Sequence, residues 1–387
     1  MTPSRKSPTR ERPDFCAARP FARMGPDSFG AEARFAMTQY EFTADALLSN
    51  DPYQEPLVAD GVRCHGGYVD GEYVSPRCAV RKPAIAAWRG RLRAEGAPLV
   101  FVPAKYVPPN YPNYEQAKFL LKEKVVEPVT RALTIISIVE GFGARIREVQ
   151  VPDFLREVKE PVEGTALAHL ARGLFEAHAR DEAGHRNEGG HKQMWEAARD
   201  IGLSKPHVPG DVLLRLMSGT VRGERRRAFP QLSERFENMV TMMANVLIVE
   251  TFAEDTFAWA KRLLGDPEVS ASPHAAHLID CVARDEVAHV DYLSVALSEL
   301  RARTLLGEGG VEIRGAEVVD EIFRRQLRGM ATARPQQNRD RLRDEIRQAI
   351  ADADRASTIA RRFEDLDSGW TFPHRDDEEL DVLLCAA

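Results

Sequence analysis

Long apolar stretches, each ended by a single glutamate, dominate the middle of the chain. One such stretch covers 133–139 and ends at Glu140, and a similar one ends at Glu250. A helix that is apolar almost all round is buried, so the pattern predicts buried helices at about 114–148 and 232–264. Burying even a neutral polar group without a partner costs roughly 2–7 kcal/mol. We therefore expect a compensating cation, most simply a metal ion, beside both glutamates.

Two further helices, predicted at about 165–200 and 273–304, carry a repeated Glu-x-x-His motif. The residues of the two copies are Glu182 with His185, and Glu286 with His289. Both copies follow the same three residues, Ala-Arg-Asp. Residues three apart share one face of a helix, so each copy would direct a carboxylate and an imidazole at one place. Together with the two glutamates above, they form the residue set of a two-metal site inside a four-helix bundle.

The fold class that follows is all-α, with a ferritin-like four-helix bundle as the main domain. The predicted parts are a disordered tail at 1–36, an irregular lead-in with a short hairpin at 37–113, the bundle at 114–304, and accessory helices with an acidic tail at 305–387. The tail at 1–36 is rich in proline and basic residues and has no helical period. A start at Met37 is the alternative, because the first foldable segment begins there.

Weaker patterns organise the chain on either side of the bundle. Residues 68–74 predict a hairpin with Asp-Gly at its turn, followed by a short helix at about 84–95 and a strand at 99–102. Residues 201–231 predict a long polar connection whose Arg-rich run at 222–227 is a solvated face or an anchor for an acidic partner. The C-terminal segment 312–365 predicts two helices separated near Pro335. These helices would pack on the bundle or mediate oligomerisation, for example as a homodimer.

Composition narrows the classes of protein. The chain has 387 residues, 43% hydrophobic and 29% charged, which is typical of a soluble globular protein. A net charge of −6 argues against an obligate nucleic-acid binder. No apolar run approaches the roughly 18 residues of a membrane span. The five cysteines are scattered, which indicates reduced thiols and a cytoplasmic protein. Cys64 and His65 are adjacent, but one pair alone indicates a structural or surface role.

The donor types indicate which metal the bundle would hold. Hard carboxylate oxygens with one imidazole per metal suit iron or manganese, whereas zinc sites use more His and Cys. One metal would take Glu140, Glu182 and His185, and the other would take Glu250, Glu286 and His289. Glu182 and Glu286 are the expected bridging ligands. Asp181 and Asp285, each directly before a ligand glutamate, are expected to orient His289 and His185 respectively.

Three more residues are candidates with an alternative role each. His178 lies four residues before Glu182 on the same helix face, as a third nitrogen ligand or as a packing residue. Glu254 lies one turn after Glu250, as a catalytic carboxylate near the oxygen-binding face or as an exposed helix charge. Tyr292 lies one turn after His289, as a redox-active phenol or as a core tyrosine.

The pattern over 114–304 resembles the ferritin-like di-iron carboxylate superfamily. This superfamily includes ribonucleotide reductase small subunits, bacterial multicomponent monooxygenases, acyl-carrier desaturases and p-aminobenzoate N-oxygenases. The N-oxygenases are similar in carrying an extra histidine four residues before a ligand glutamate, as His178 does here. In them it belongs to the second motif, where this chain has Val282.

The resemblance implies a centre of two iron ions that activates O₂ for hydroxylation, desaturation or N-oxidation. The substrate would be a small organic or carrier-bound molecule, and an external donor would supply electrons. Manganese or a mixed Mn/Fe centre stays open, because ligand type does not separate the two metals. The alternatives are a ferroxidase or iron-handling protein and a non-catalytic helical scaffold. The long segments outside the bundle favour a substrate-binding enzyme over iron storage.

Overall fold

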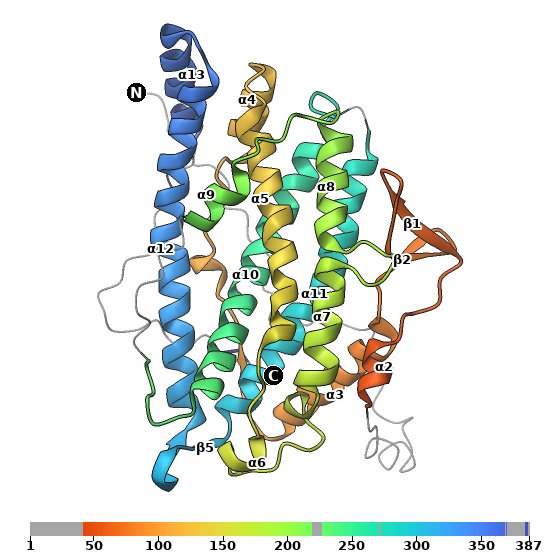
Figure 1. The fold of residues 1–387 in the computed structure, drawn as a ribbon, viewed down its shortest axis with the longest axis vertical. Coiled ribbons are helices and arrows are strands. Elements are labelled where there is room, and N and C mark those ends of the chain that lie inside the picture. Colours follow the sequence, from red (N-terminus) through yellow and green to blue (C-terminus); the bar gives the residue numbers. More distant parts are fainter. Residues whose placement is uncertain (1–41, 219–226, 271, 368, 370–383, 386–387) are drawn as a thin grey trace, which may run out of the picture.

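Helices make up most of the part of the chain that the computed structural model describes, namely residues 42–218, 227–270, 272–367, 369 and 384–385 (Figure 1). The expected all-α class is confirmed at this level, with only short strands beside the helices. The tail at 1–36, the acidic segment at 376–379 and most of the Arg-rich run lie outside the described residues. None of the described helices has the length and hydropathy needed to cross a membrane.

Five helices lie side by side at the centre of the molecule (Figure 1). They are α5 (Glu127–Gly143), α7 (Phe175–Ala183), α8 (His191–Gly202), α10 (Glu234–Leu264) and α11 (His274–Arg301). α10 packs on α11, while α8 packs on α5 and α11. The predicted helices at 232–264 and 273–304 are confirmed as α10 and α11. Ser233 caps α10 by accepting a hydrogen bond from the Phe236 N–H.

The two other long helices predicted from the sequence are each broken. Residues 114–148 form α4 (Tyr114–Lys122), α5 and a 3₁₀ turn, η3 (Ala144–Glu148). Lys124 adopts a left-handed backbone with φ of 61° between α4 and α5, which ends the first helix. Pro128 then occupies the first turn of α5, where a missing N–H costs nothing.

The break in the predicted helix at 165–200 matters more for function. The segment begins as η4 (Ala166–His169) and η5 (Leu170–Leu174) and continues as α7, which stops at Ala183. Gly184 has φ of 82°, and a Cβ there would lie 2.2 Å from the Glu188 carbonyl oxygen. Gly190 is similarly crowded by backbone oxygens. Glycine alone fits such positions, so the chain leaves the helix at Gly184 and re-enters one at His191.

The lead-in before the bundle contains more regular structure than expected. Its elements are α2 (Ala44–Leu48), the antiparallel strands β1 (Glu55–Ala59), β2 (Val62–Val69) and β3 (Glu72–Val74), α3 (Cys78–Ala94), β4 (Leu99–Val100) and η2 (Ala104–Tyr106). The predicted hairpin is confirmed, with Asp70 and Gly71 at positive φ in its turn. α3 starts earlier than predicted because the Asp51 carboxylate accepts hydrogen bonds from the Cys78 and Ala79 N–H groups.

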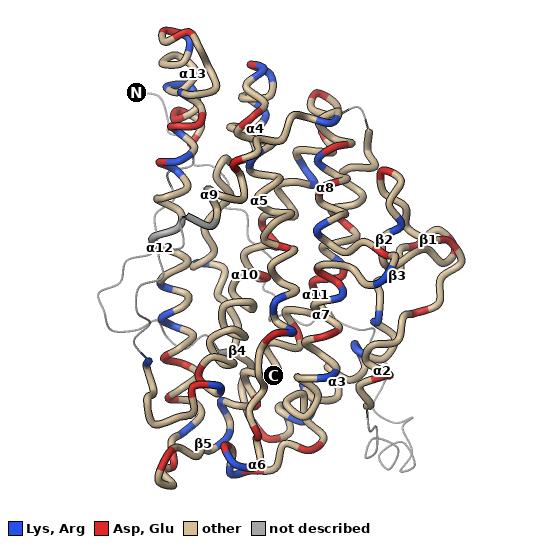
Figure 2. The backbone as a smooth tube through the Cα atoms, in the orientation of Figure 1, with Lys and Arg blue, Asp and Glu red and all other residues tan. Residues whose placement is uncertain are grey.

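The C-terminal helices are also divided differently from the prediction. α12 (Gly315–Ala349) continues through Pro335, and α13 (Ala353–Asp365) begins after Asp352, which caps it. α12 packs against α10 and α11. The remaining elements are α6 (Phe154–Glu157), α9 (Val212–Ser218), the hairpin β5 (Thr304–Leu306) and β6 (Glu312–Arg314) with η6 (Glu308–Gly310) at its turn, and β7 (Leu384–Cys385). α9 lies within the predicted polar connection at 201–231. Figure 2 shows acidic and basic residues interspersed along the helices.

Two clusters of buried apolar residues form the core, and α11 contributes to both. Cys281 and Val282 belong to one cluster, while Ala288 and Tyr292 belong to the other. The intervening turn of α11 carries Glu286. The two halves of the apolar core therefore enclose a layer of acidic residues.

Candidate metal centre

Seven ionisable side chains converge where the two halves of the core meet. They are Glu140 from α5, His178 and Glu182 from α7, His191 from α8, Glu250 from α10, and Glu286 and His289 from α11. Each is no more than 7% exposed. Buried carboxylates and imidazoles in this number need a compensating charge or partner.

Two of the carboxylates lie between the imidazoles. Glu286 directs Oε1 at His191 Nδ1, 2.6 Å away, and Oε2 at His289 Nδ1, 2.5 Å away. Glu182 Oε1 lies 3.3 Å from His289 Nδ1, 3.4 Å from His178 Nε2 and 3.5 Å from His191 Nδ1. This arrangement suits two carboxylates that are shared between two ions, the role expected for these glutamates.

The remaining ligand candidates divide into two groups on either side of the shared carboxylates. His178 Nε2 lies 3.4 Å from Glu250 Oε1, and the rings of His178 and His289 stack with centroids 3.8 Å apart. On the other side, His191 Nδ1 lies 3.7 Å from Glu140 Oε2. We call the first the His178 position and the second the His191 position, and His289 lies within ligand distance of both.

Several polar atoms of this cluster are buried without a hydrogen-bond partner among the described residues. They are His178 Nε2, both carboxylate oxygens of Glu182, His191 Nδ1 and Glu286 Oε1. Buried polar atoms in folded proteins nearly always have a partner. His191 Nδ1 and Glu286 Oε1 are close together yet are not aligned for a hydrogen bond. Atoms that converge in this way fit the coordination of metal ions.

The pKa shifts in the cluster show that the protein groups alone do not balance its negative charge. Burial, with Glu182 and Glu286 nearby, raises the pKa of Glu140 well above its usual value. Burial and the same two carboxylates raise the pKa of Glu250 in the same way. These shifts mean that a negative charge on either group is unfavourable without added positive charge. Divalent cations would remove that penalty.

Asp181 supports His289 from behind, as the sequence predicted. Its Oδ2 lies 3.0 Å from His289 Nε2, so the ring presents Nδ1 to the cluster. The guanidinium of Arg81 donates to the same carboxylate at 2.7 Å, and Arg77 donates to its other oxygen. Burial opposes the ionised form, but Arg77 and Arg81 hold the pKa of Asp181 well below its usual value.

Asp285 is the corresponding support for His191, and the prediction that it would serve His185 is wrong. Asp285 Oδ2 lies 3.4 Å from His191 Nε2 and 3.1 Å from His65 Nε2, and it accepts a hydrogen bond from the Tyr73 hydroxyl at 2.8 Å. Burial opposes ionisation, yet His191 and His65 lower the pKa of Asp285 to about 2. His65 therefore has a role beside the cluster that its adjacent cysteine did not indicate.

The structure does not bring His185 to the cluster, and His191 lies there instead. His185 follows the end of α7, is partly exposed, and pairs its backbone with Glu188. On the unbroken helix that the sequence predicted, His191 would lie two and a half turns from Glu182, on the opposite face. The closely spaced Gly184, Gly189 and Gly190 were the available signal for a break.

The other sequence candidates lie at different distances from the cluster. His178 lies within it, and its Nδ1 is 3.2 Å from the Tyr292 hydroxyl. Burial and the neighbouring His289 lower the pKa of His178 well below its usual value, which favours the neutral ring. Glu254 is half-buried on α10 and belongs to none of the three possible metal-ligand groups among the described residues. Burial and two nearby aspartates raise its pKa to about 7.

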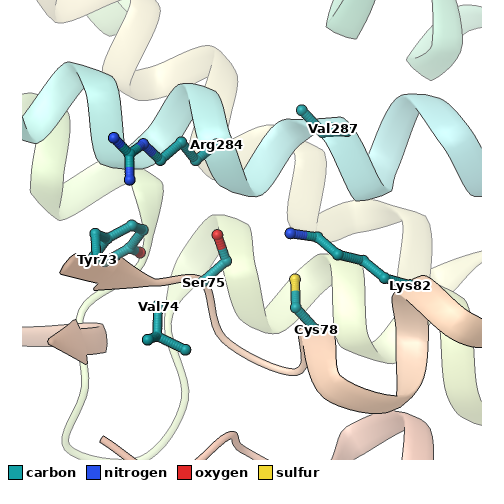
Figure 3. A pocket seen from close by; sticks show the side chains of 7 residues that line it. All are labelled: Tyr73, Val74, Ser75, Cys78, Lys82, Arg284 and Val287. Carbon is teal, nitrogen blue, oxygen red and sulfur yellow. The ribbon is translucent and has the colours of Figure 1, made fainter. Parts of the chain in front are cut away.

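A surface pocket of about 420 Å³ lies on the outer side of the α11 turn that carries Glu286. Its lining is Tyr73, Val74, Ser75, Cys78, Lys82, Arg284 and Val287. Figure 3 shows Ser75, Cys78 and Lys82 facing the α11 ribbon. Tyr73 lines this pocket, and its hydroxyl donates a hydrogen bond to the buried carboxylate of Asp285.

No protein-family model, curated protein or solved structure matches this chain. The case for its function therefore depends on the geometry of the buried cluster.

Proposed function

We propose that this chain is an O₂-activating non-haem di-iron oxygenase or oxidase built on a ferritin-like four-helix bundle. The observation that carries the proposal is the buried set of four glutamates and three histidines, four of which, His178, Glu182, His191 and Glu286, have atoms without a hydrogen-bond partner among the described residues. The ligands come from α5, the α7–α8 pair, α10 and α11, which is how two-metal carboxylate sites are assembled in helical bundles.

The donor set supports iron as the metal. Four carboxylates match the charge of two divalent ions, and three imidazoles add nitrogen donors that suit iron. Manganese, or one ion of each kind, is the alternative within the same proposal. Bound iron would supply the electrons and the Lewis acidity for reaction with O₂.

The residues of the chain hold this site in a defined geometry. Glu182 and Glu286 would hold the metal together with the imidazoles of His191 and His289, because each carboxylate lies close to Nδ1 of both rings. Asp181 and Asp285 accept from Nε2 of His289 and His191, so that both rings direct Nδ1 inward.

His178 differs in having Nδ1 against the Tyr292 hydroxyl, so its Nε2 is the ligating atom. The hydroxyl oxygen can accept the Nδ1 proton and thereby keep the ring in this tautomer.

Apolar side chains exclude water from the cluster. Phe175 packs edge-on to Tyr292 on one side, and Trp195 lies against Phe257 in the other half of the core. All four are nearly or fully buried. A dry, apolar surrounding protects reactive species from water. The proposal also needs an external electron donor and a small organic or carrier-bound substrate.

The test is to load the purified chain with ferrous iron without oxygen, remove the excess, and then add O₂. We expect about two irons per chain, O₂ consumption and a new visible absorption. Glu182→Ala and Glu286→Ala should abolish the O₂ response while keeping the helical circular dichroism. Many irons per chain would favour iron storage, and absence of bound metal would leave a non-catalytic scaffold.

A further inference from the structure

We propose that the surface pocket outside α11 is a binding site for a small organic anion that carries a carboxylate or phosphate group and an apolar part. The pocket has a volume of about 420 Å³, and its lining comes from β3, α3, the turn between them and α11. Ligand pockets in proteins typically measure roughly 300–1,000 Å³. The pocket therefore has room for a small organic molecule.

Two cationic side chains extend to this pocket from different helices. Lys82 extends from α3 and Arg284 from α11, and both are exposed (Figure 3). Lys82 has no ion pair with an acidic side chain in the described part of the chain. Arg284 pairs with Asp280 at 3.1 Å, but this carboxylate also pairs with Lys261. One carboxylate shared by two cations leaves positive charge beside the pocket.

The described residues that line the pocket supply no negative charge in return. They include neither aspartate nor glutamate. Burial, together with the nearby Asp285, raises the pKa of Tyr73 well above its usual value, so the phenol is neutral. Burial also raises the pKa of the Cys78 thiol, although Arg81 and Lys82 act in the opposite direction. The pocket is therefore positively charged at neutral pH and attracts anions.

A serine in the lining supplies a hydrogen-bond donor for the anion. Ser75 is only 7% exposed, and its hydroxyl has no hydrogen-bond partner among the residues that the structure describes. Figure 3 shows this hydroxyl directed towards α11, into the space that Lys82 also enters. Buried polar groups nearly always have a partner, and a hydroxyl can donate to a carboxylate or phosphate oxygen. The Ser75 hydroxyl therefore indicates a polar ligand.

The rest of the lining favours an organic anion over an inorganic one. Val74 and Val287 are apolar, and Val287 is 45% exposed on α11. The ring of Tyr73 adds an aromatic surface, while its hydroxyl already donates to Asp285. Small-molecule sites combine apolar walls with a few polar groups that fix the orientation of the ligand. An anion with an apolar body matches this lining.

The proposed site is separate from the buried cluster. Arg284 and Val287 flank Asp285 and Glu286 in the sequence, but they lie on the exposed face of α11, whereas the two acidic residues are buried. The occupant of the pocket therefore contacts the outer face of this helix and is not a ligand of a metal ion in the cluster. We expect anion binding to need no metal.

The experiment is a binding titration of the purified full chain, followed by the NMR signals of the ligand in a phosphate-free buffer of low ionic strength. The probes are phenylacetate and phenyl phosphate, with phenylacetamide as a neutral analogue. We expect at least one anion to bind, the amide to bind at least tenfold more weakly, and salt to weaken the anion complex. The tighter anion identifies the preferred head group. Equal binding of phenylacetate, phenyl phosphate and the amide, or no binding of either anion, would overturn the inference.

Matched variants at Val287 test whether the anion binds in this pocket. Because Val287 is partly exposed, both Val287→Glu and Val287→Lys keep a long side chain in contact with solvent. Val287→Glu should weaken anion binding roughly tenfold or more through repulsion of like charges, whereas Val287→Lys should preserve or strengthen it. Equal effects would contradict the inference, since the two side chains differ chiefly in the sign of their charge.

Variants of the polar lining complete the test. Lys82→Met removes one positive charge, and Ser75→Ala removes one hydrogen-bond donor to an anion, so each should weaken binding roughly tenfold. Lys105→Met makes the same change at an exposed lysine outside the pocket and should leave the affinity unchanged. Equal losses in Lys82→Met and Lys105→Met would show non-specific binding and refute the inference. A chain that binds the anion but retains no iron would support this inference and refute only the proposed function.

Discussion

Replacing His191 by alanine tests most directly which histidine belongs to the site. The structure places His191 in the cluster, whereas the sequence predicted His185. His191 is fully buried, and its Nδ1 is 2.6 Å from Glu286 Oε1. His185 is partly exposed and belongs to none of the three possible metal-ligand groups among the described residues. His185→Ala is therefore the matched control, with the same substitution made six positions away.

The expected loss follows from the coordination of the His191 position. Removing an outer partner of a metal ligand typically weakens binding 10–100-fold. His191 is a direct ligand in our proposal, and the group that it forms with Glu182, Glu286 and His289 would lose one of its two imidazoles. We therefore expect affinity for one of the two ions to fall roughly 100-fold or more, with the other ion retained. His185→Ala should leave both affinities unchanged.

Equilibrium binding of Mn²⁺ or Co²⁺ measures this directly, by counting bound ions against free metal. His191→Ala also removes the imidazole between Glu286 and Asp285, so circular dichroism and thermal unfolding of the metal-free variants are needed alongside. If His185→Ala lost one ion while a folded His191→Ala kept both, the assignment of His191 would be refuted.

Three further variants test other parts of the account. A Cβ at Gly143 would lie 2.8 Å from Glu182 Cγ, so Gly143→Ala should displace that shared carboxylate and weaken metal binding at least tenfold by titration; unchanged affinity would show that the close approach has no consequence. Burial raises the pKa of Glu254 to about 7 in the folded chain, so folding favours the protonated carboxyl. This contribution to stability is complete below the unfolded pKa and is lost as pH rises through about 7. Glu254→Gln should therefore stabilise the metal-free protein by about 2–3 kcal/mol near pH 8 and by little near pH 4, as measured by urea unfolding; equal effects at both pH values would contradict this. Tyr292→Phe removes the hydroxyl 3.2 Å from His178 Nδ1 and should alter the optical spectrum of a cobalt-loaded centre, whereas an identical spectrum would show that the ring needs no such support.

The sequence predicted the central helices well where one apolar stretch and clear end signals coincide. α10 has a serine cap and a glycine end, and α11 follows a proline, so both were located to within a few residues. Glu250 was recognisable because it ends an apolar stretch, and Glu286 because it belongs to a repeated Glu-x-x-His motif. These features depend on neighbouring residues alone.

The break between α7 and α8 could not be derived from apolar periodicity. It depends on the backbone of Gly184, whose positive φ is set by the close approach of the following loop. The prediction of an unbroken helix assigned to His185 the place that His191 occupies in the cluster. A motif with the expected spacing therefore pointed to a histidine outside the buried cluster, because its last residue lies beyond the end of the helix.

The contacts between the lead-in segment and the cluster could not be predicted from local sequence patterns either. His65 and Asp285 are 220 residues apart in the chain, and Arg81 and Asp181 are 100 apart. Their contact is a product of the tertiary fold. Nothing in a hairpin or a short amphipathic helix indicates that it will support a buried ionic cluster.

The central claim is that the buried glutamates and histidines bind two iron ions that react with O₂. The most direct measurement is iron per chain after anaerobic loading and removal of excess metal, followed by the optical response to O₂. The account predicts about two irons per chain and a new visible absorption that disappears in Glu286→Ala. A folded wild-type chain that retains no iron would contradict it.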